Sequence, residues 1–449
     1  MKNLTIENVI RACGGKWLGD AAGLETELSA VTTDSRSVTP GCLFAAIKGE
    51  RADGHDYIAA TLAKGAACAL CERKPEGING RMILVPDTVT ALQKIAAFYR
   101  AQFDIPVIGV TGSVGKTTAK EMVAAVLSER FRVHKTSGNF NNDLGVPITL
   151  FGLNETHEAA VVEMGVSHPG DMRRLAETVR PTMALFTVIG HAHLEFLKSR
   201  EGILAEKSVV NQYLPDDGIV LCNGDDDLLA AMKCRQKVLR FGMGENCEVR
   251  AENVQILPDG GTSCTVVYGN RRLDLRIQAY GEHMVYAALE GAAAGFVLGL
   301  SDEEIIRGIS AYEPVGRRAR RIETGKLTII DDCYNANPTS VASALRSLSR
   351  GAGRKVCILG DMLELGEDAA ALHCETGELA RALGIDLVLT AGTLGAEIAR
   401  GADQPDHAYA DRETLIAALP ALLQPGDTVL VKASHSMRFE EITAALEKF

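Results

Sequence analysis

Several features that would assign this chain to a membrane, a secretory route or a nucleic-acid complex are missing from its sequence. No apolar run approaches the ~20 residues that a membrane-spanning helix needs. The stretch from Met1 to Asn8 lacks the apolar core of a signal peptide. The net charge of -11 at pH 7 argues against a nucleic-acid coat. We therefore expect a cytoplasmic protein with neither a membrane nor a nucleic-acid partner.

Internal repeats and low-complexity segments are also missing. With 449 residues the chain is too long for one hydrophobic core, so we expect about two to four domains. Its hydrophobic content of 46% and charged content of 23% are ordinary for a globular protein. The 11 cysteines are an odd count scattered among strand-like segments, which indicates reduced thiols rather than disulfides.

The most informative stretch that is present runs from Val107 to Thr118 and predicts a strand, a phosphate loop and a helix. An apolar run ends in a glycine-containing turn, and apolar residues at helical spacing follow it. Backbone N–H groups in such a turn and at the helix N-terminus can hold polyphosphate. Lys116 would reach the β- and γ-phosphates, and the Thr117 hydroxyl would bind Mg²⁺. The chain is therefore predicted to bind a nucleoside triphosphate.

This loop is a tighter variant of the general phosphate-loop pattern. The general pattern has a glycine where this chain has Val110. The local form is Thr-Gly-x-x-Gly-Lys-Thr-Thr. The loop residues expected to contact the nucleotide are Thr111, Gly112, Ser113, Val114, Gly115, Lys116, Thr117 and Thr118.

Alternating strand and helix signals divide the chain into three predicted α/β domains, residues 1–102, 103–313 and 314–449. The first is small and carries no nucleotide signal. The second contains the phosphate loop and a mostly parallel sheet, with an antiparallel hairpin set predicted over 247–279. The third is Rossmann-like in outline, but no Gly-x-Gly-x-x-Gly opens it, so we do not expect it to bind a dinucleotide.

Polar residues follow several of the predicted strands in the second domain, where ligands usually bind in open α/β sheets. Glu163 lies at the end of one strand, and a carboxylate there would suit Mg²⁺ beside substrate phosphates. His191 and His193 follow the next strand and could bind a metal or simply be solvated. Lys207 falls on the face of a predicted helix over 201–213, and by sequence alone it is a surface lysine.

Other polar clusters are candidates for substrate binding, and each has a structural alternative. Asn139 and Asn142 lie in an asparagine-rich loop that could recognise a polar substrate or cap the next helix. Ser35 and Arg36 could bind a phosphorylated ligand or form only a polar turn. The arginine-rich run 317–321 lies at a predicted domain junction, where it could reach phosphate across a cleft or form a solvated face.

Motifs spread over the chain carry a resemblance to a known family. They are residues 111–118 (TGSVGKTT), 138–143 (GNFNND), 163–165 (EMG), 168–171 (HPGD), 332–338 (DCYNANP) and 359–366 (LGDMLELG). Together they resemble the Mur ligase family, the ATP-dependent amino-acid and peptide ligases of bacterial cell-wall synthesis. Within the family they are most similar to the enzymes that add D-alanyl-D-alanine to UDP-N-acetylmuramoyl-tripeptide. The resemblance implies that reaction, with an acyl phosphate intermediate, ATP and Mg²⁺, and we expect a monomer.

The resemblance also implies roles for single residues. Lys116 would hold the ATP phosphates, Thr117 and Glu163 would bind one Mg²⁺, and His193 would help to bind a second. Lys207 matches a lysine that the family carbamylates, which turns an ammonium into a carboxylate-like metal ligand and replaces the surface interpretation.

Further residues are implied in nucleotide and substrate binding. Arg318, or Arg317 if the register is shifted, would contact ATP, and Asp332 would contact the ribose. His283 matches the family histidine near the nucleotide. The residues expected to bind the other substrates are Ser35, Arg36, Lys48, Asn139 and Asn142.

Two segments depart from the family pattern. Met284 and Ala287 stand where much of the family has asparagines near the adenine, so adenine recognition by that helix is expected to differ. Ala433 and His435 stand where glycine and arginine are usual, so dipeptide recognition or closure of the last domain is expected to differ slightly.

Two alternative functions stay open on the sequence. The chain could be a related ligase that activates a carboxylate in the same way on another substrate, for folate polyglutamylation or for the preceding Mur step. A phosphate-loop NTPase switch could instead bind a protein partner and use hydrolysis as a signal. A switch has no use for a carbamylated lysine, so Lys207 discriminates between a switch and a ligase.

Overall fold

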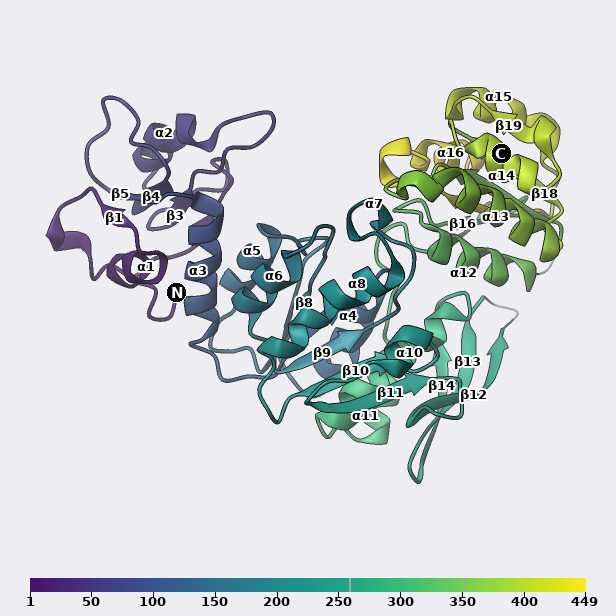
Figure 1. The fold of residues 1–449 in the computed structure, drawn as a ribbon, viewed down its shortest axis with the longest axis horizontal. Coiled ribbons are helices and arrows are strands. Elements are labelled where there is room, and N and C mark those ends of the chain that lie inside the picture. The colour runs from purple at the N-terminus through teal and green to yellow at the C-terminus, as the bar shows by residue number, and fades with distance from the viewer. Residues whose placement is uncertain (258–259, 352) are drawn as a thin grey trace.

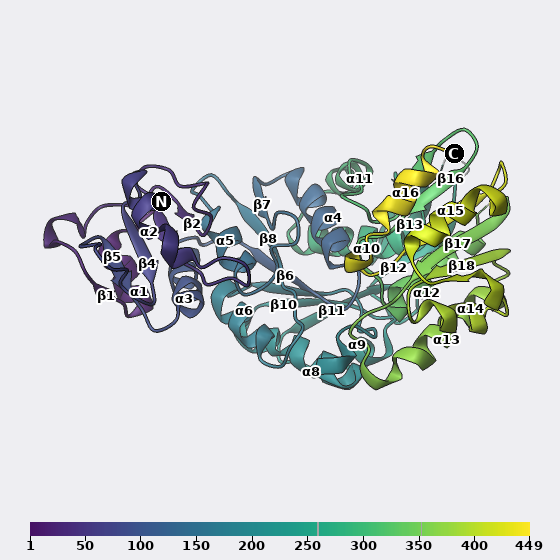
Figure 2. The same cartoon turned by 90° about the horizontal axis from the view of Figure 1, so that it is seen from above.

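The computed structural model describes residues 1–257, 260–351 and 353–449, which are organised around three β-sheets. Figure 1 and Figure 2 show the three sheets and their helices following one another along the long axis of the molecule. Most strands pair in parallel, so the predicted three-domain α/β fold is confirmed. In the described part of the chain, no helix combines the length and the apolar character needed to cross a bilayer.

The first sheet lies at the N-terminal end of the molecule (Figure 1). Its elements are α1 (Ile6–Cys13), β1 (Lys16–Trp17), β2 (Val31–Thr32), β3 (Leu43–Ala45), α2 (Ile58–Ala63), β4 (Cys68–Cys71), β5 (Met82–Leu84) and α3 (Thr88–Arg100). The strand order is β1-β5-β4-β3-β2, and only β1 pairs antiparallel among the described strands of this sheet. Because β2 and β3 are parallel neighbours, the loops that follow them lie at the same edge of the sheet.

The second sheet has nine strands, in the order β14-β13-β12-β11-β10-β9-β6-β8-β7. Their bounds are β6 (Val107–Thr111), β7 (Val133–Lys135), β8 (Ala159–Glu163), β9 (Met183–Phe186), β10 (Ile219–Asn223), β11 (Lys237–Gly242), β12 (Val249–Ile256), β13 (Thr262–Tyr268) and β14 (Arg271–Ile277). Strands β6 to β12 pair in parallel, and β12, β13 and β14 form the predicted antiparallel hairpins. Strand β6 lies between β8 and β9, so the loop that follows it opens at the centre of the parallel part.

Helices cover both faces of this sheet. On one face lie α4 (Lys116–Ser128), α10 (His283–Val297) and α11 (Asp302–Ser310), and on the other lie α5 (Gly145–Phe151), α6 (Asp171–Val179) and α8 (Arg200–Ser208). Alternate strand residues divide between the faces, since Val161 packs with the first group and Val162 with the second. The helix predicted over 201–213 is shorter than expected, because α8 ends at Ser208 and the chain continues as a 3₁₀ segment, Val209–Tyr213.

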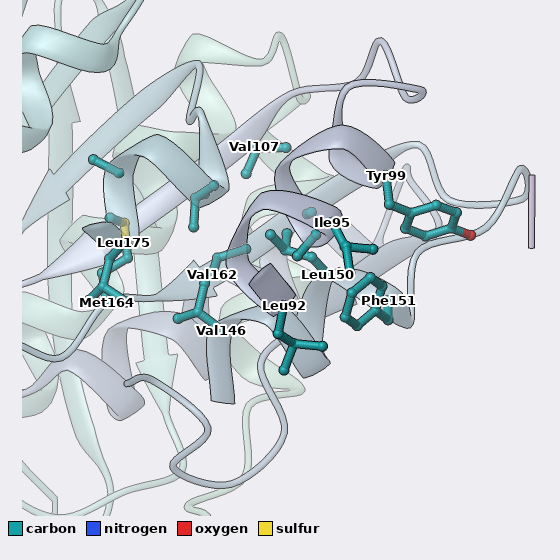
Figure 3. Packing of buried hydrophobic residues seen from close by; sticks show 14 of the residues in the cluster. Leu92, Ile95, Tyr99, Val107, Val146, Leu150, Phe151, Val162, Met164 and Leu175 are labelled. Carbon is teal, nitrogen blue, oxygen red and sulfur yellow. The ribbon is translucent and has the colours of Figure 1, made fainter. Parts of the chain in front are cut away.

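Helix α3 belongs to the first part of the chain but packs against the second. Figure 3 shows Leu92 of α3 beside Val146 of α5, and both belong with Leu150 to one continuous buried cluster. The Tyr99 hydroxyl donates a hydrogen bond of 2.7 Å to the carbonyl oxygen of Leu153, which follows α5. The first two sheets therefore share hydrophobic packing through this helix.

Helices α4 and α11 approach so closely that one glycine is required between them. A Cβ on Gly308 would lie 2.4 Å from the Cα of Val126 and 3.0 Å from the carbonyl oxygen of Ala125. We expect Gly308→Ala to destabilise the protein by about 2–3 kcal/mol, because backbone atoms must move apart. The midpoint of thermal unfolding measures this loss. Gly23→Ala is the matched control, since nothing lies within 4 Å of a Cβ there. Equal midpoints for the two variants would contradict the close packing.

The third sheet contains six strands in the order β15-β16-β20-β17-β18-β19, all parallel except β15. Its elements are β15 (Arg320–Glu323), β16 (Thr328–Asp331), α12 (Pro338–Ser349), β17 (Lys355–Gly360), α13 (Ala369–Ala382), β18 (Leu387–Ala391), α14 (Gly395–Gly401), β19 (Ala408–Tyr409), α15 (Arg412–Leu422), β20 (Thr428–Lys432) and α16 (Glu440–Leu446). Asn337 caps α12 in a capping box with Ser340, which fixes the turn between β16 and this helix.

Candidate active site

The loop after β6 contains two glycines whose backbone has a positive φ, which favours glycine. Gly112 has a φ of +146°, and a Cβ there would lie 1.9 Å from the Thr187 hydroxyl oxygen. Gly115, immediately before α4, has a φ of +84°. The predicted strand, loop and helix are therefore present. The first residues of α4 line a cavity, where the N-terminus of the helix favours the binding of an anion.

Cationic and anionic groups face one another at this loop. Lys116 Nζ donates a hydrogen bond of 2.9 Å to the carbonyl oxygen of Gly112. The Thr117 hydroxyl donates to Glu163 Oε2 at 2.9 Å. Burial lowers the pKa of Lys116, and the Glu163 carboxylate opposes that shift. These groups could bind phosphate and a metal ion side by side.

Glu163 ends β8, next to β6, and is held by two donors. Besides the Thr117 hydroxyl, it accepts a hydrogen bond of 2.8 Å from Asn141 Nδ2. Asn141 is a site residue that the sequence reasoning did not single out, although it lies in the predicted asparagine-rich loop. Asn142 Oδ1 accepts the backbone N–H of Gly145 at 2.9 Å, but the N-cap residue of α5 is Leu144 and not Asn142. Asn139 and Asn142 both line the nearby cavity, and their substrate contacts stay a prediction.

The oxygen atoms at this position fit a magnesium ion. A buried carboxylate beside a threonine hydroxyl offers hard oxygen ligands, and phosphate oxygens would complete the set. Among the described residues, no group of three or more His, Cys, Asp or Glu side chains is arranged to hold a metal. The protein ligands of a magnesium ion at this position would therefore be one carboxylate and one hydroxyl, rather than a cluster of acidic side chains.

Lys207 is buried, which contradicts the surface position expected from sequence alone. It lies on α8 and is 1% exposed, and its Nζ has no hydrogen-bond partner in the part of the chain that the structure describes. Burial lowers the pKa of this amine well below its usual range, and the charge of Lys116 adds to the effect. An unpaired buried amine is costly, so the position suits a chemically modified lysine.

His193 lies at a contact between the second and third sheets. It precedes α7 (Leu194–Leu197), and its Nδ1 is 2.5 Å from Glu364 Oε2, beyond the end of β17. The neighbouring His191 donates its backbone N–H to the Thr339 hydroxyl of α12 at 3.2 Å. The loop after β9 therefore touches the third domain, and the metal role of His193 stays a prediction.

The third domain contributes its own charged groups, and the structure distinguishes between the two junction arginines. Arg318 lines the cavity and stacks on Tyr334, with its guanidinium 3.8 Å from the ring centre. Arg317 pairs instead with the buried Asp331 at 2.8 Å. Of the two arginines that the sequence offered, Arg318 is therefore the one whose guanidinium lies in the cavity wall.

Asp332 lies opposite the phosphate loop and is already paired. Lys432 Nζ, at the end of β20, contacts Asp332 Oδ2 at 2.6 Å. The second carboxylate oxygen accepts the backbone N–H of Ala319 at 3.2 Å. These contacts hold the Asp332 carboxylate at the cavity wall, where the predicted ribose contact would be made.

A cavity of about 960 Å³ lies between the second and third domains and collects most of the predicted residues. Its lining includes Ser113, Val114, Gly115, Lys116, Thr117, Thr118, Asn139, Asn142, Glu163, His193, His283, Arg318 and Asp332. Met284 and Ala287, which depart from the family pattern, line it as well. Its volume is in the range of small-molecule sites and suits a nucleotide with a second ligand.

The residues predicted for the first domain lie outside this cavity. Arg36 is exposed and forms an ion pair of 2.8 Å with Asp34. The Ser35 carbonyl oxygen accepts a hydrogen bond of 3.0 Å from Lys64, and Lys48 is exposed. These residues follow β2 and β3, at one edge of the first sheet. Their role in binding a uridine nucleotide stays a prediction.

The glycine-dependent loop at the N-terminus of α4 and the metal-type oxygens beside it define an enzyme of the phosphate-loop ATP-using class. A model of the Mur ligase middle domain matches residues 110–295. The glutamate ligase domain of Mur ligases matches 317–435, and the Mur ligase family catalytic domain matches 27–100. Together with the full-length relatives below, these matches show that the chain belongs to the Mur ligase family, whose members are ATP-dependent ligases.

Relatives of known identity cover nearly the whole chain. The UDP-N-acetylmuramoyl-tripeptide–D-alanyl-D-alanine ligase of Bacillus subtilis is 38% identical over 98% of both chains, and that of Escherichia coli is 37% identical over 96% of both. A crystal structure of MurF from Acinetobacter baumannii matches with a TM-score of 0.92 at 31% identity over 99% of each chain. MurF from Thermotoga maritima in complex with ADP has a TM-score of 0.84 at 29% identity, covering 93% of this chain and 97% of that one.

Proposed function

We propose that the protein joins D-alanyl-D-alanine to the terminal carboxylate of UDP-N-acetylmuramoyl-tripeptide, with conversion of ATP to ADP and phosphate, in peptidoglycan precursor synthesis. The observation that carries this proposal is the similarity, over nearly all of the chain, to ligases that bear this name. The cavity between the second and third domains supports it, because the phosphate loop faces polar groups of both domains there. The protein would act as a monomer in the cytoplasm, where ATP is available.

The chemistry needs an activated carboxylate, because a carboxylate is a poor electrophile. The tripeptide carboxylate attacks the γ-phosphoryl group and forms an acyl phosphate with release of ADP. The dipeptide amine then attacks the acyl carbon, and phosphate leaves from the tetrahedral intermediate. Lys116 offsets the negative charge of the two anionic substrates, and Thr117 and Glu163 would hold Mg²⁺, which neutralises the transferred phosphoryl group when bound.

Lys207 would take part as a carbamate. Burial favours its neutral amine, which can attack CO₂ and lose a proton to give a carbamate. The added carboxylate-like group would act as a metal ligand, beside the second Mg²⁺ that His193 would help to bind. The unpaired Nζ among the described residues supports this role, because the modification removes the ammonium charge and adds oxygens that can bind a cation.

The three domains would divide the substrates. Residues 1–102, with Ser35, Arg36 and Lys48, would bind the uridine nucleotide, and residues 103–313 would bind ATP. Residues 314–449 would bind the incoming dipeptide and close over the acyl phosphate, which keeps water away from it. Asn139 and Asn142 would contact the substrate from the loop beside Glu163.

Phosphate release under different substrate combinations tests the assignment. We expect release from ATP and Mg²⁺ only when UDP-N-acetylmuramoyl-tripeptide and D-alanyl-D-alanine are both present, together with a pentapeptide product by mass spectrometry. Release without either substrate would favour an NTPase switch. Release with a different acceptor would retain the ATP site and refute the substrate assignment.

A further inference from the structure

Helix α10 carries a glutamate that no step of the proposed reaction uses. Glu290 lies inside the helix, is 4% exposed, and lines the cavity between the second and third domains. No hydrogen bond or ion pair to its carboxyl group is found among the described residues. Burial raises the pKa of Glu290 well above its usual range, and no charged neighbour contributes. Burial therefore favours the uncharged form of this carboxyl group.

Glu290 lies on the wall of the cavity that continues from the phosphate loop. His283, Met284, Ala287 and Glu290 all line the cavity and recur at helical spacing along α10. The next residue, Gly291, packs on α4, the helix that begins at the phosphate loop, since a Cβ there would lie 3.1 Å from Met122 Cγ. The nucleoside of a triphosphate bound at the loop would therefore lie against this stripe of α10.

The stripe combines apolar surface with polar groups for which no partner is found among the described residues. Met284 and Ala287 are each 3% exposed and can pack against the flat face of a base, but neither side chain can donate a hydrogen bond to its edge. The Tyr286 hydroxyl is occupied, because it donates to Asp225 at 2.9 Å. His283 Nδ1 is buried and has no hydrogen-bond partner within residues 1–257, 260–351 and 353–449. Buried polar groups need hydrogen bonds, so the unpaired groups of the stripe point to a ligand that supplies them.

We propose that Glu290 selects adenine nucleotides by pairing its carboxyl group with the amino-bearing edge of the base. An uncharged carboxyl group offers one donor and one acceptor, as a glutamine amide does. Adenine presents an acceptor at N7 and a donor at its 6-amino group, which is why glutamine pairs with that edge in two places. Guanine presents two acceptors there, N7 and O6, and leaves the acceptor of the carboxyl group unpaired. This inference rests on the proposed function only in taking ATP as the nucleotide.

Nucleotide binding without the other substrates tests the proposal. We would titrate the wild-type protein, Glu290→Gln and Glu290→Leu with ADP, with GDP and with purine riboside 5′-diphosphate, which lacks the 6-amino group. The wild type and Glu290→Gln are expected to prefer ADP over both other nucleotides by at least about fivefold, the lower end for a two-point contact to a base. Glu290→Leu is expected to lose that preference through weaker binding of ADP alone. Glu303→Leu, on the exposed start of α11, is the control and should keep the wild-type ratios.

Several results would overturn the proposal. One is a wild-type protein that binds purine riboside 5′-diphosphate as tightly as ADP, which needs no variant at all. Another is a Glu290→Leu variant with the wild-type ADP preference, or with equal losses for all three nucleotides, as a packing role predicts. A Glu290→Gln variant without ADP preference would indicate that the carboxylate is ionised in the complex. Because these measurements omit the tripeptide and the dipeptide, failure of the ligase assignment would leave their outcome unaffected.

Discussion

Lys207→Ala is expected to lower the kcat of pentapeptide formation by about 10²- to 10³-fold, with a smaller effect on the KM for ATP. The size follows from losing a charged group that stabilises the transferred phosphoryl group in a water-poor site. The side chain is 1% exposed and its Nζ has no partner among the described residues, so surface electrostatics cannot account for such a loss. The measurement is the rate of pentapeptide formation at saturating substrates, with and without added formate or acetate.

Rescue separates the carbamate from a packing role. A short-chain carboxylate can enter the space left by alanine and supply the missing oxygen ligands, so we expect partial recovery of Lys207→Ala. Lys94→Ala, at an exposed position of α3, should show neither the loss nor the rescue. Full activity in Lys207→Ala would remove the carbamate from the mechanism. A loss that no carboxylate relieves would make Lys207 a structural residue.

Glu163→Gln is expected to lower kcat by about 10²- to 10³-fold and to raise the Mg²⁺ concentration needed for half-maximal rate. The carboxylate accepts hydrogen bonds from the Thr117 hydroxyl and from Asn141 Nδ2. An amide would turn an N–H group toward one of these donors and would remove the negative charge that attracts the cation. The measurement is the rate of pentapeptide formation over a Mg²⁺ titration.

A matched carboxylate on the same stretch of chain provides the control for this experiment. Glu158 immediately precedes β8 and is exposed, and its carboxylate accepts a hydrogen bond of 2.9 Å from the backbone N–H of Arg132. Glu158→Gln should keep both the rate and the Mg²⁺ requirement of the wild type. If Glu163→Gln needed no more Mg²⁺ than Glu158→Gln, Glu163 would not be a metal ligand.

The parts of the site that the sequence could predict are those set by local chemistry. The phosphate loop could be predicted because the φ of +84° at Gly115 and the helix that starts at Lys116 are determined by neighbouring residues in the sequence. The end of β8 at Glu163 and the hydrogen bond from the Gly145 N–H to Asn142 likewise follow from a short stretch of chain. The observed ends of helices and strands differ from the predicted ones by a few residues. One example is Ser208, where the α-helix ends and a 3₁₀ segment follows.

The remaining parts depend on residues that meet only in the folded chain. Nothing near Lys207 in sequence indicates that its Nζ is buried, because α8 is polar around it. Asn141 rather than Asn142 donates to Glu163, and this contact joins two residues that are distant in the sequence. Glu290 did leave a local signal that was not used, namely a single acidic residue inside the apolar helix His283–Val297. Burial of an acidic side chain in such a helix costs folding free energy unless a partner or a ligand forms hydrogen bonds with it.

The packing of α3 limits how the chain can be divided into fragments. Residue 102 ends the first domain by sequence, yet Leu92 and Tyr99 of the preceding helix cover Val146 and Leu153 in the second. A fragment beginning at residue 103 would expose the apolar side of α5 to water and leave a buried carbonyl group without its donor. Production of a nucleotide-binding fragment for ligand screening should therefore start before Thr88, so that α3 is kept whole.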